Sequence, residues 1–173
     1  MRVLIVSDIH GNFSNMKKVM QDVGSVDRIL ILGDVLSGYG GEGYNPEQLA
    51  LFLNLYSDKI IYVKGNCDNY NIDLLKSYVD KSFITVSIDK KLFFMTHGHI
   101  YNRYNLPSCD FDVFLQGHTH VPMMDIEDNV LYLNPGSITN PRNGSRKSYI
   151  LYDNGIFYLK DLDNKIIKSI DFK

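Results

Sequence analysis

The sequence predicts an α/β fold with a parallel first half and a largely antiparallel second half. Two observations lead to this prediction. Aliphatic runs alternate with helix-like segments up to residue 63, and hairpin patterns follow from residue 82 onward. Strands that alternate with helices are typical of parallel sheets, because each helix returns the chain to the start of the next strand. No linker or repeat divides the chain, so we expect one domain over residues 1–173.

The first half begins with an aliphatic run at residues 3–6, which is typical of a strand buried on both faces. Apolar residues then recur at helical spacing over residues 13–23, and Gly24 ends this expected helix. Three more elements follow: a strand at 28–32, a helix that opens at Asn45 and Pro46, and a strand at 59–63. We expect the three strands to lie parallel.

The second half is a series of hairpin patterns, in which β-branched and aromatic runs are separated by short polar turns. The turn at 154–155 is Asn-Gly, a pair that favours a two-residue hairpin. The expected strands lie at residues 83–88, 92–96, 111–115, 121–127, 130–133, 149–152, 156–159 and 166–170.

Composition restricts the classes of partner. The formal net charge is −2 and like charges form no dense block, so nothing in the sequence indicates binding to nucleic acid or to an anionic membrane. No apolar run approaches the roughly 20 residues that span a bilayer, and the start lacks the cleavage region of a signal peptide. Cys67 and Cys109 make no disulfide framework. We therefore expect a cytoplasmic protein.

Residues that bind metals gather just beyond the expected strands. Asp8, Asp34 and Asn66 follow the three strands of the first half, and each of the five histidines follows a strand beside a glycine or an acid: His10, His97, His99, His118 and His120. Ligands bind at the carboxyl ends of strands in such sheets. Imidazole with carboxylate suits manganese, iron, cobalt, nickel or zinc better than calcium or magnesium. Seven or eight donors are too many for one tetrahedral ion, so a pair of metals is the simplest account.

Each of these residues also has a structural interpretation. Taken alone, Asp8 and His10 are explained by a helix cap and a turn histidine, and Asp34 and Asn66 are explained as ordinary turn residues beside glycine. Their placement at successive strand ends favours the metal-binding interpretation.

Five motifs make the chain resemble the calcineurin-like metallophosphoesterases, because they occur in the order seen in that family. They are DIH at 8–10, GD at 33–34, GNCD at 65–68, HGH at 97–99 and GHTH at 117–120. The additional motifs GYNP at 43–46 and NPGS at 134–137 are similar to those of small bacterial and archaeal phosphodiesterases of the YfcE type. The resemblance covers nearly the whole chain. It implies a four-layer α/β/β/α sandwich of two mixed sheets face to face with helices outside.

The resemblance also implies the site and its chemistry. Two divalent transition-metal ions are expected, Mn²⁺ first, with Ni²⁺, Co²⁺, Fe²⁺ or Zn²⁺ as alternatives. A hydroxide that bridges them is expected to attack the phosphorus of a small phosphodiester in line. The implied catalytic residues are Asp34, Asn66 and His99. The first metal is assigned to Asp8, His10, Asp34 and His120, and the second to Asn66, His97 and His118, with Asp34 bridging both.

Cys67 departs from the family pattern. Many relatives have a histidine after the asparagine of GNCD, and that histidine is assigned to protonating the leaving alkoxide. A thiol with an ordinary pKa of about 8.5 is a poor substitute for an imidazole acid. His99, Asp68 or a metal-bound water are the other proton sources that the sequence offers.

Three residues are expected to touch the substrate: Asn12, Cys67 and His99. Each has an alternative role, since Asn12 is also a suitable helix cap, Cys67 a small space-filling side chain and His99 a loop residue. The tyrosines and glycines of residues 38–44 suit a lip that grips the substrate or a contact in a homo-oligomer, although a flexible surface loop is the default.

Two other functions fit the same motifs. One is a non-catalytic scaffold, since a retromer subunit shares this small fold but has eroded metal motifs. The other is a phosphomonoesterase or a nuclease on the same metal centre. A nuclease is expected to add a basic groove, which neither the charge nor the length of the chain provides.

Overall fold

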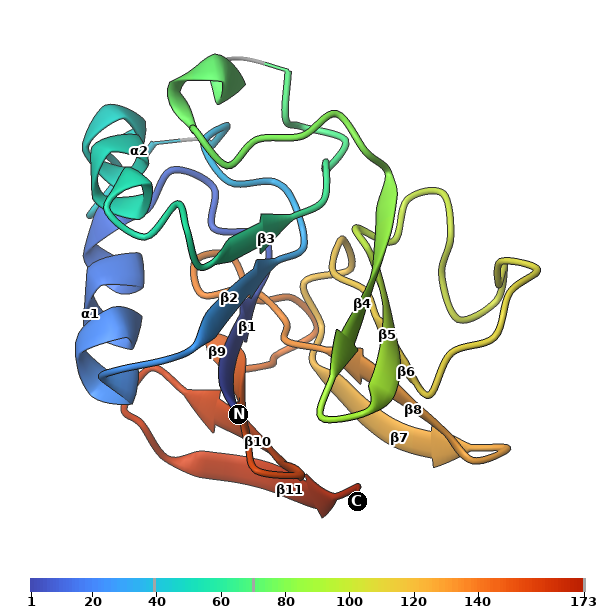
Figure 1. Cartoon of the computed structure of the whole chain (residues 1–173). Coiled ribbons are helices and arrows are strands. Elements are labelled where there is room, and N and C mark those ends of the chain that lie inside the picture. Colours follow the sequence, from blue (N-terminus) through green and yellow to red (C-terminus); the bar gives the residue numbers. More distant parts are fainter. Residues whose placement is uncertain (39, 70, 173) are drawn as a thin grey trace.

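The computed structural model describes residues 1–38, 40–69 and 71–172, and its described part contains two mixed β-sheets packed face to face. The strand order is β11-β10-β9-β1-β2-β3 in the first sheet and β4-β5-β6-β8-β7 in the second. Figure 1 shows the two sheets side by side, with the two α-helices on the outer side of the first sheet. The predicted α/β class with two mixed sheets is confirmed.

The first sheet joins both ends of the chain. Its strands β1, β2 and β3 are parallel, as predicted, and β9 pairs antiparallel with the other edge of β1. Two successive hairpins connect β9 to β10 and β10 to β11. The six strands are β1 (Arg2–Val6), β2 (Arg28–Ile31), β3 (Ile60–Tyr62), β9 (Ser148–Asp153), β10 (Ile156–Asp161) and β11 (Ile166–Asp171).

Local capping sets the bounds of α1 (Phe13–Val23). The Asn12 side chain accepts a hydrogen bond from the N–H of Asn15 at the start, and Gly24 ends the helix with a φ of 65°. The second helix, α2 (Pro46–Asn54), begins in the same way, because the Asn45 side chain accepts from the N–H of Gln48. After β3 the chain forms only a 3₁₀ turn, η1 (Ile72–Leu74).

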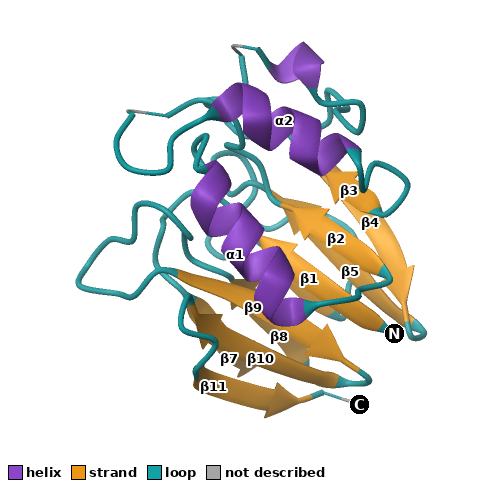
Figure 2. Cartoon of the chain, turned by 90° about the vertical axis from the view of Figure 1, so that its left-hand side faces the viewer, coloured by secondary structure: helices purple, strands orange, loops and turns teal. Residues whose placement is uncertain are grey.

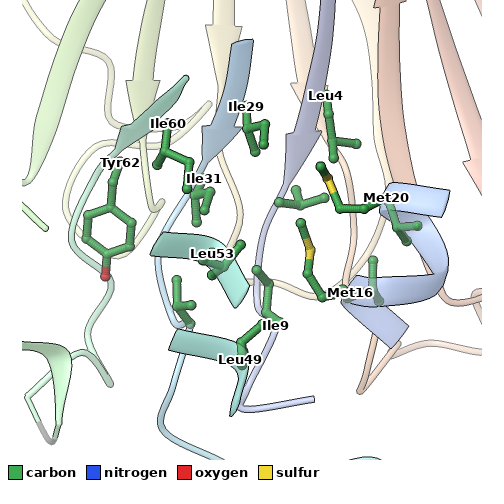
Figure 3. Packing of buried hydrophobic residues seen from close by; sticks show 14 of the residues in the cluster. Leu4, Ile9, Met16, Met20, Ile29, Ile31, Leu49, Leu53, Ile60 and Tyr62 are labelled. Carbon is green, nitrogen blue, oxygen red and sulfur yellow. The ribbon is translucent and has the colours of Figure 1, made fainter. Parts of the chain in front are cut away.

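Both helices lie across one face of the first sheet (Figure 2). Figure 3 shows the packing: Met16 and Met20 of α1 and Leu49 and Leu53 of α2 point at the aliphatic side chains of β1 and β2. In α1 the buried positions Met16, Val19, Met20 and Val23 follow the i, i+3, i+4, i+7 pattern of one face of a helix. No helix in the part of the chain that the structure describes is long and apolar enough to cross a membrane.

The second sheet combines hairpins with parallel pairs. The hairpins β4-β5 and β7-β8 form as predicted, but β5, β6 and β8 lie parallel to one another. The carboxyl ends of these three strands therefore lie at one edge. The strands are β4 (Phe83–Ile88), β5 (Lys91–Thr96), β6 (Val113–Leu115), β7 (Met123–Glu127) and β8 (Val130–Asn134).

A second apolar core lies between the sheets, where Val3 and Ile5 of β1 belong to the same buried cluster as Phe93 of β5 and Leu131 of β8. The outer face of the second sheet carries a third cluster built on stacked aromatic rings, with the centroids of Phe94 and Phe114 5.4 Å apart. Tyr101, from the long loop that follows β5, packs against this cluster. A loop therefore forms the outer layer on this side, where Figure 1 shows it as the yellow-green segment at the right.

Candidate metal centre

The turns at the strand ends hold their polar side chains in an uncommon backbone conformation. Five of the seven predicted ligands have a positive φ: 52° at Asp8, 48° at His10, 52° at Asp34, 64° at His118 and 59° at His120. Residues other than glycine rarely occupy this region, and they remain there only where surrounding contacts dictate it. The backbone is therefore organised to direct these side chains toward one place.

Glycines allow the turns of different strands to touch. A Cβ atom on Gly65 would lie 2.1 Å from Oδ1 of Asp34, and one on Gly117 would lie 1.9 Å from Oγ of Ser7. Both distances are far below van der Waals contact, so any side chain at these positions would push the turns apart. The glycines of GNCD and GHTH thus have a packing role that is separate from any metal chemistry.

Three histidines are oriented by backbone carbonyl groups. Nδ1 of His10 lies 2.7 Å from the carbonyl oxygen of Ser37. Nδ1 of His97 lies 2.6 Å from that of Leu32, and Nδ1 of His120 lies 2.7 Å from that of Asn140. A carbonyl oxygen only accepts hydrogen bonds, so in each ring Nδ1 carries the proton and donates it. In the neutral ring, Nε2 then presents a lone pair to the interior of the site, which is the tautomer that binds a metal.

The first donor group is Asp8, His10 and His120, whose ligand atoms lie within 4.8 Å of one another. The Nε2 atoms of His10 and His120 are 3.3 Å apart, and Oδ1 of Asp8 lies 3.9 Å and 3.2 Å from them. That buried Oδ1 has no hydrogen-bond partner among the described residues. Two lone pairs and a carboxylate oxygen that converge are stabilised by a cation between them. These residues therefore fit a divalent metal ion.

The second donor group is Asp8, Asp34 and His97. Oδ2 of Asp34 lies 3.4 Å from Nε2 of His97 and 4.0 Å from Nε2 of His10, so it stands between the two groups. The side-chain oxygen of Asn66 adds a donor 3.0 Å from Nε2 of His97.

The acids and histidines of this site shift one another's pKa. Burial by itself raises the pKa of Asp34, but hydrogen bonding and charge from His97, together with the N–H of Cys67, hold it well below its ordinary value. Burial lowers the pKa of His97 and His120, yet their aspartate partners raise it above the ordinary value in both. Burial and the neighbouring His97 lower the pKa of His118. Asp34 therefore stays ionised at neutral pH and supplies negative charge for a cation.

All seven predicted ligands meet at this edge of the sandwich. A cavity of about 110 Å³ is lined by His10, Asp34, Asn66, Cys67, His118, His120 and Arg142. Asp8 and His97 belong to the donor groups described above, and the ring of His118 lies 5.1 Å from that of His97. The metal-binding roles of the individual residues stay predictions that this geometry supports.

The three predicted substrate contacts lie in different places. Cys67 lines the cavity, and His99 is an exposed residue whose ring lies 5.3 Å from that of His97. Asn12 is buried, with Oδ1 accepting from Asn15 and Nδ2 donating to the carbonyl oxygen of Glu42. Both polar atoms of Asn12 are thus engaged within the protein, which favours its capping role.

Asp68 is a buried support for the turn that carries Asp34. One of its oxygens accepts from the N–H groups of Asp34 and Gly65 at 2.7 and 2.8 Å, and the other from that of Val35 at 2.9 Å. The hydroxyl of Tyr62 donates to it as well. With both oxygens occupied, Asp68 fixes the backbone of the site, and this disfavours it as the proton source considered from the sequence.

Sequence reasoning missed two contributors. Oγ of Ser137 donates to the carbonyl oxygen of Asp8 at 2.7 Å and so ties β8 to the first strand end. Arg142 lines the cavity, but it comes from a Pro-Arg-Asn-Gly turn that resembles any surface loop. Ser137 was detectable through the NPGS motif, whereas no local signal marked Arg142. In the loop of residues 38–44, Tyr44 forms an isolated bridge with Asn12, and Tyr39 lies outside the described residues.

Two mixed sheets with a buried aspartate and histidine cluster at one edge are suited to a metal-dependent hydrolase, and comparison with known proteins identifies the family. The family model described as the calcineurin-like phosphoesterase superfamily domain matches residues 1–155, so the chain belongs to that superfamily. Phosphodiesterase YfcE of Escherichia coli strain K12 is 33% identical over 96% of this chain and 95% of its own length. A solved structure of YfcE, titled a phosphoesterase from E. coli, superposes with a TM-score of 0.92 at 32% identity and covers 100% of both chains.

Two further similar proteins differ in what their similarity shows about this chain. Phosphodiesterase MJ0936 of Methanocaldococcus jannaschii is 30% identical over 79% of this chain and 83% of its own length. Vps29 of Entamoeba histolytica, solved in complex with Zn²⁺, has a TM-score of 0.68 at 20% identity and covers 100% of both chains. At that identity the Vps29 likeness shows the fold alone.

Proposed function

We propose that the chain hydrolyses small phosphodiesters at a binuclear centre of divalent transition-metal ions. The observation that carries the proposal is the pair of overlapping donor groups, which share Asp8 and have Asp34 between them. When bound, two such ions supply an activated water for in-line attack and neutralise charge that develops at phosphorus. The mixture of imidazole and carboxylate favours manganese, nickel, cobalt, iron or zinc. The names of YfcE and MJ0936 support the diester specificity.

The protein itself contributes orientation. Backbone carbonyl groups hold the three Nδ1 atoms, so each Nε2 stays directed at the site without a change of tautomer. Asp68 fixes the turn of Asp34 in the same way through three N–H groups. Such rigid positioning lowers the reorganisation that the reaction requires.

Arg142 is placed to bind the phosphate group. Among the described residues it is the only lysine or arginine that lines the cavity, and its backbone N–H donates to the carbonyl oxygen of His120 at 3.2 Å. Its side chain is exposed and lies at the mouth of the site. A guanidinium group binds two oxygens of a phosphate at once, so Arg142 is expected to hold non-bridging oxygens of the substrate.

Cys67 is a weak source of protons for the leaving group. Without bound metal, burial and the charge of Asp34 raise the pKa of its thiol to about 11, and even at its ordinary pKa of about 8.5 a thiol is a weaker acid than an imidazolium group. We infer that the leaving alcohol departs with little help from this position, which favours substrates whose leaving group is already a stable anion.

The other functions have less support. A scaffold role rests on the Vps29 likeness, which carries only the fold, whereas the complete set of donors favours an enzyme. A nuclease is disfavoured because Arg142 is the only lysine or arginine among the described residues that line the cavity, and the net charge is −2. We infer a cytoplasmic location, which the two free cysteines Cys67 and Cys109 support.

The decisive test is a substrate panel on metal-stripped protein. Phosphomonoesters, phosphodiesters and cyclic nucleotides are assayed after each divalent ion is returned singly, with bound metal measured by elemental analysis. We expect hydrolysis of diesters, abolished by chelation and restored best by manganese, nickel or cobalt. Full activity in metal-free protein would overturn the metal mechanism, and a preference for monoesters would overturn the assigned substrate class.

A further inference from the structure

A larger cleft lies directly beside the metal centre. Its volume is about 450 Å³, and the side chains that give it its chemistry are Lys64, Asn66, Asn69, Asp80, Ser82 and His99. They come from the segment after β3, from the approach to β4 and from the turn after β5. Because β3 and β4 are the edge strands of their sheets, the cleft lies where the first sheet meets the second.

The cleft and the metal cavity share a wall. Asn66 lines both of them, and His99 lines the cleft with its ring 5.3 Å from that of His97. A phosphodiester has two ester groups on its phosphorus. The 110 Å³ cavity has room for little more than the phosphate itself, so a group attached to that phosphate must leave the cavity. The cleft is the adjoining space that receives it.

The lining of the cleft is mostly polar, with Ile100 as an apolar side chain at its edge, and its charges are balanced. Nζ of Lys64 lies 3.0 Å from Oδ1 of Asp80, so the ammonium group already has an anionic partner. The amide of Asn69 and the hydroxyl of Ser82 add uncharged hydrogen-bonding groups. An alkyl group in this cleft would displace water from these polar atoms without replacing its hydrogen bonds, whereas hydroxyl groups would replace them.

We propose that this cleft binds one of the two ester groups of the substrate and selects a hydroxylated alcohol, such as a polyol or a sugar. The proposal rests on the phosphodiesterase function proposed above. It assigns specificity mainly to residues other than the predicted metal ligands, and it disfavours a second strong anion as the preferred group because the ammonium group of Lys64 is paired with Asp80.

The first experiment compares three p-nitrophenyl phosphodiesters whose second ester group is methyl, propyl or 2,3-dihydroxypropyl. In the metal-loaded protein, we expect kcat/KM for the dihydroxypropyl ester to exceed that for the propyl ester by about three- to tenfold, the effect of one or two hydrogen bonds. Ser82→Ala and Lys64→Met are expected to bring this ratio close to one. The matched control is Lys81→Met, an exposed lysine one residue before Ser82 that does not line the cleft, and it should keep the ratio of the unmodified protein.

The second experiment changes the preferred charge. Asp80→Asn removes the partner of Lys64, so an ester that carries a carboxylate, 3-carboxypropyl p-nitrophenyl phosphate, should gain about fivefold in kcat/KM relative to the propyl ester. Adding Lys64→Met to that variant should cancel the gain. Both residues are at least partly exposed, with side-chain exposures of 30% for Lys64 and 72% for Asp80, so a folded protein is expected in each case.

The outcomes separate the two proposals. Turnover of the methyl ester with equal rates for the propyl and dihydroxypropyl esters would overturn the cleft assignment and leave the phosphodiesterase function intact. The same holds if Asp80→Asn leaves the rate with the carboxylate ester unchanged. No turnover of any diester by metal-loaded protein would overturn the proposed function, and the cleft assignment with it.

Discussion

Asp34 shows how one residue is positioned by its neighbours at the atomic scale. Its N–H donates to Asp68, and its Oδ1 accepts from the N–H of Cys67 at 2.8 Å. Its Oδ2 lies near Nε2 of His10 and of His97. Backbone, carboxylate and imidazole atoms thus fix every polar atom of the side chain. A change of one oxygen at this position is therefore expected to affect both donor groups.

We expect Asp34→Asn to lower bound metal and kcat/KM by about a hundredfold or more, because the amide removes the charge that balances the cations. His99→Ala is the comparison, since it leaves the donor atoms of both groups in place. Metal content by elemental analysis and the rate with bis(p-nitrophenyl) phosphate check the prediction. Equal losses in the two variants would argue against a bridging role for Asp34.

Arg142 allows a test of phosphate binding with a close control. Arg142→Ala is expected to raise KM by about tenfold with a smaller change in kcat, since the lost interaction is mainly with the phosphate oxygens. Arg146→Ala removes the same charge four residues away, where the guanidinium pairs with Asp161 at 2.8 Å outside the cavity. Titration with inorganic phosphate should show the same contrast. If both variants bind phosphate like the unmodified protein, Arg142 does not contact it.

Cys67 determines how strongly the rate depends on the leaving group. Because a thiol is a poor general acid even at its ordinary pKa of about 8.5, kcat/KM should fall steeply as the pKa of the leaving group rises, with aryl diesters cleaved well and alkyl diesters poorly. Cys67→His should recover up to about a hundredfold for poor leaving groups and change aryl esters little. Metal occupancy is checked in both proteins. A flat dependence in the unmodified enzyme would show that another acid, such as His99, already acts.

At the scale of elements, local polar contacts hold the connections between strands. The turn from β10 to β11 is closed by Asp161, which is 4% exposed and accepts hydrogen bonds from the N–H groups of Asp163 and Lys165, each at 3.0 Å, and from Arg146. In the first sheet, β9 lies between this hairpin and β1, the strand that carries Asp8 at its end. Its stability is therefore separable from activity.

Asp161→Ala should lower the free energy of unfolding by about 1 to 3 kcal/mol at neutral pH and leave kcat unchanged. Burial by itself raises the pKa of Asp161, but Lys165, Arg146 and Asp163 together lower it below its ordinary 3.8. A group whose pKa is lower in the folded protein than in the unfolded chain stabilises the fold at pH values above its unfolded pKa. This contribution is lost as the pH falls through its folded pKa. The difference between the two proteins should thus shrink below about pH 4 in urea titrations. A pH-independent difference would assign the effect to packing alone.

At the scale of the whole molecule, the metal centre joins the two sheets. Asp8, His10 and Asp34 follow strands of the first sheet, while His97, His118 and His120 follow strands of the second. Direct hydrogen bonds cross the same boundary, from the N–H of His118 to Asp8 at 3.0 Å and from His97 to the carbonyl oxygen of Leu32 at 2.6 Å. A bound ion therefore acts on the packing of one sheet against the other.

Metal binding should consequently stabilise the whole fold. At a free ion concentration about a hundredfold above Kd, linkage adds about 2.7 kcal/mol, which corresponds to a rise in Tm of about 5 to 10 °C for a chain of this size. Thermal melts with and without EDTA, and with Mn²⁺ returned, measure this shift. Asp34→Asn should reduce the shift strongly, whereas Lys81→Met should keep it. A Tm independent of metal would mean that the folded protein does not bind the ions.

Local patterns in the sequence were sufficient for the elements and for most of the candidate site. The expected strands of the first half and the three later hairpins all form, because burial periodicity and turn residues act over a few neighbouring positions. The predicted ligands could be collected in advance because each one directly follows a strand, and parallel strands end at a common edge. The role of Asn12 was hard to predict, since asparagine is suited both to capping a helix and to contacting a substrate.

The sequence by itself thus determined the elements and the set of candidate donors, through signals that lie within a few residues of each other. Only the tertiary structure decided that β9 pairs with β1, that β5, β6 and β8 run parallel, and that a loop covers the outer face of the second sheet. It also brought Arg142 to the metal cavity and assembled the cleft around Lys64 and Ser82. These features join segments far apart in the chain, and such contacts depend on how complete faces pack together, which no local pattern of side chains encodes.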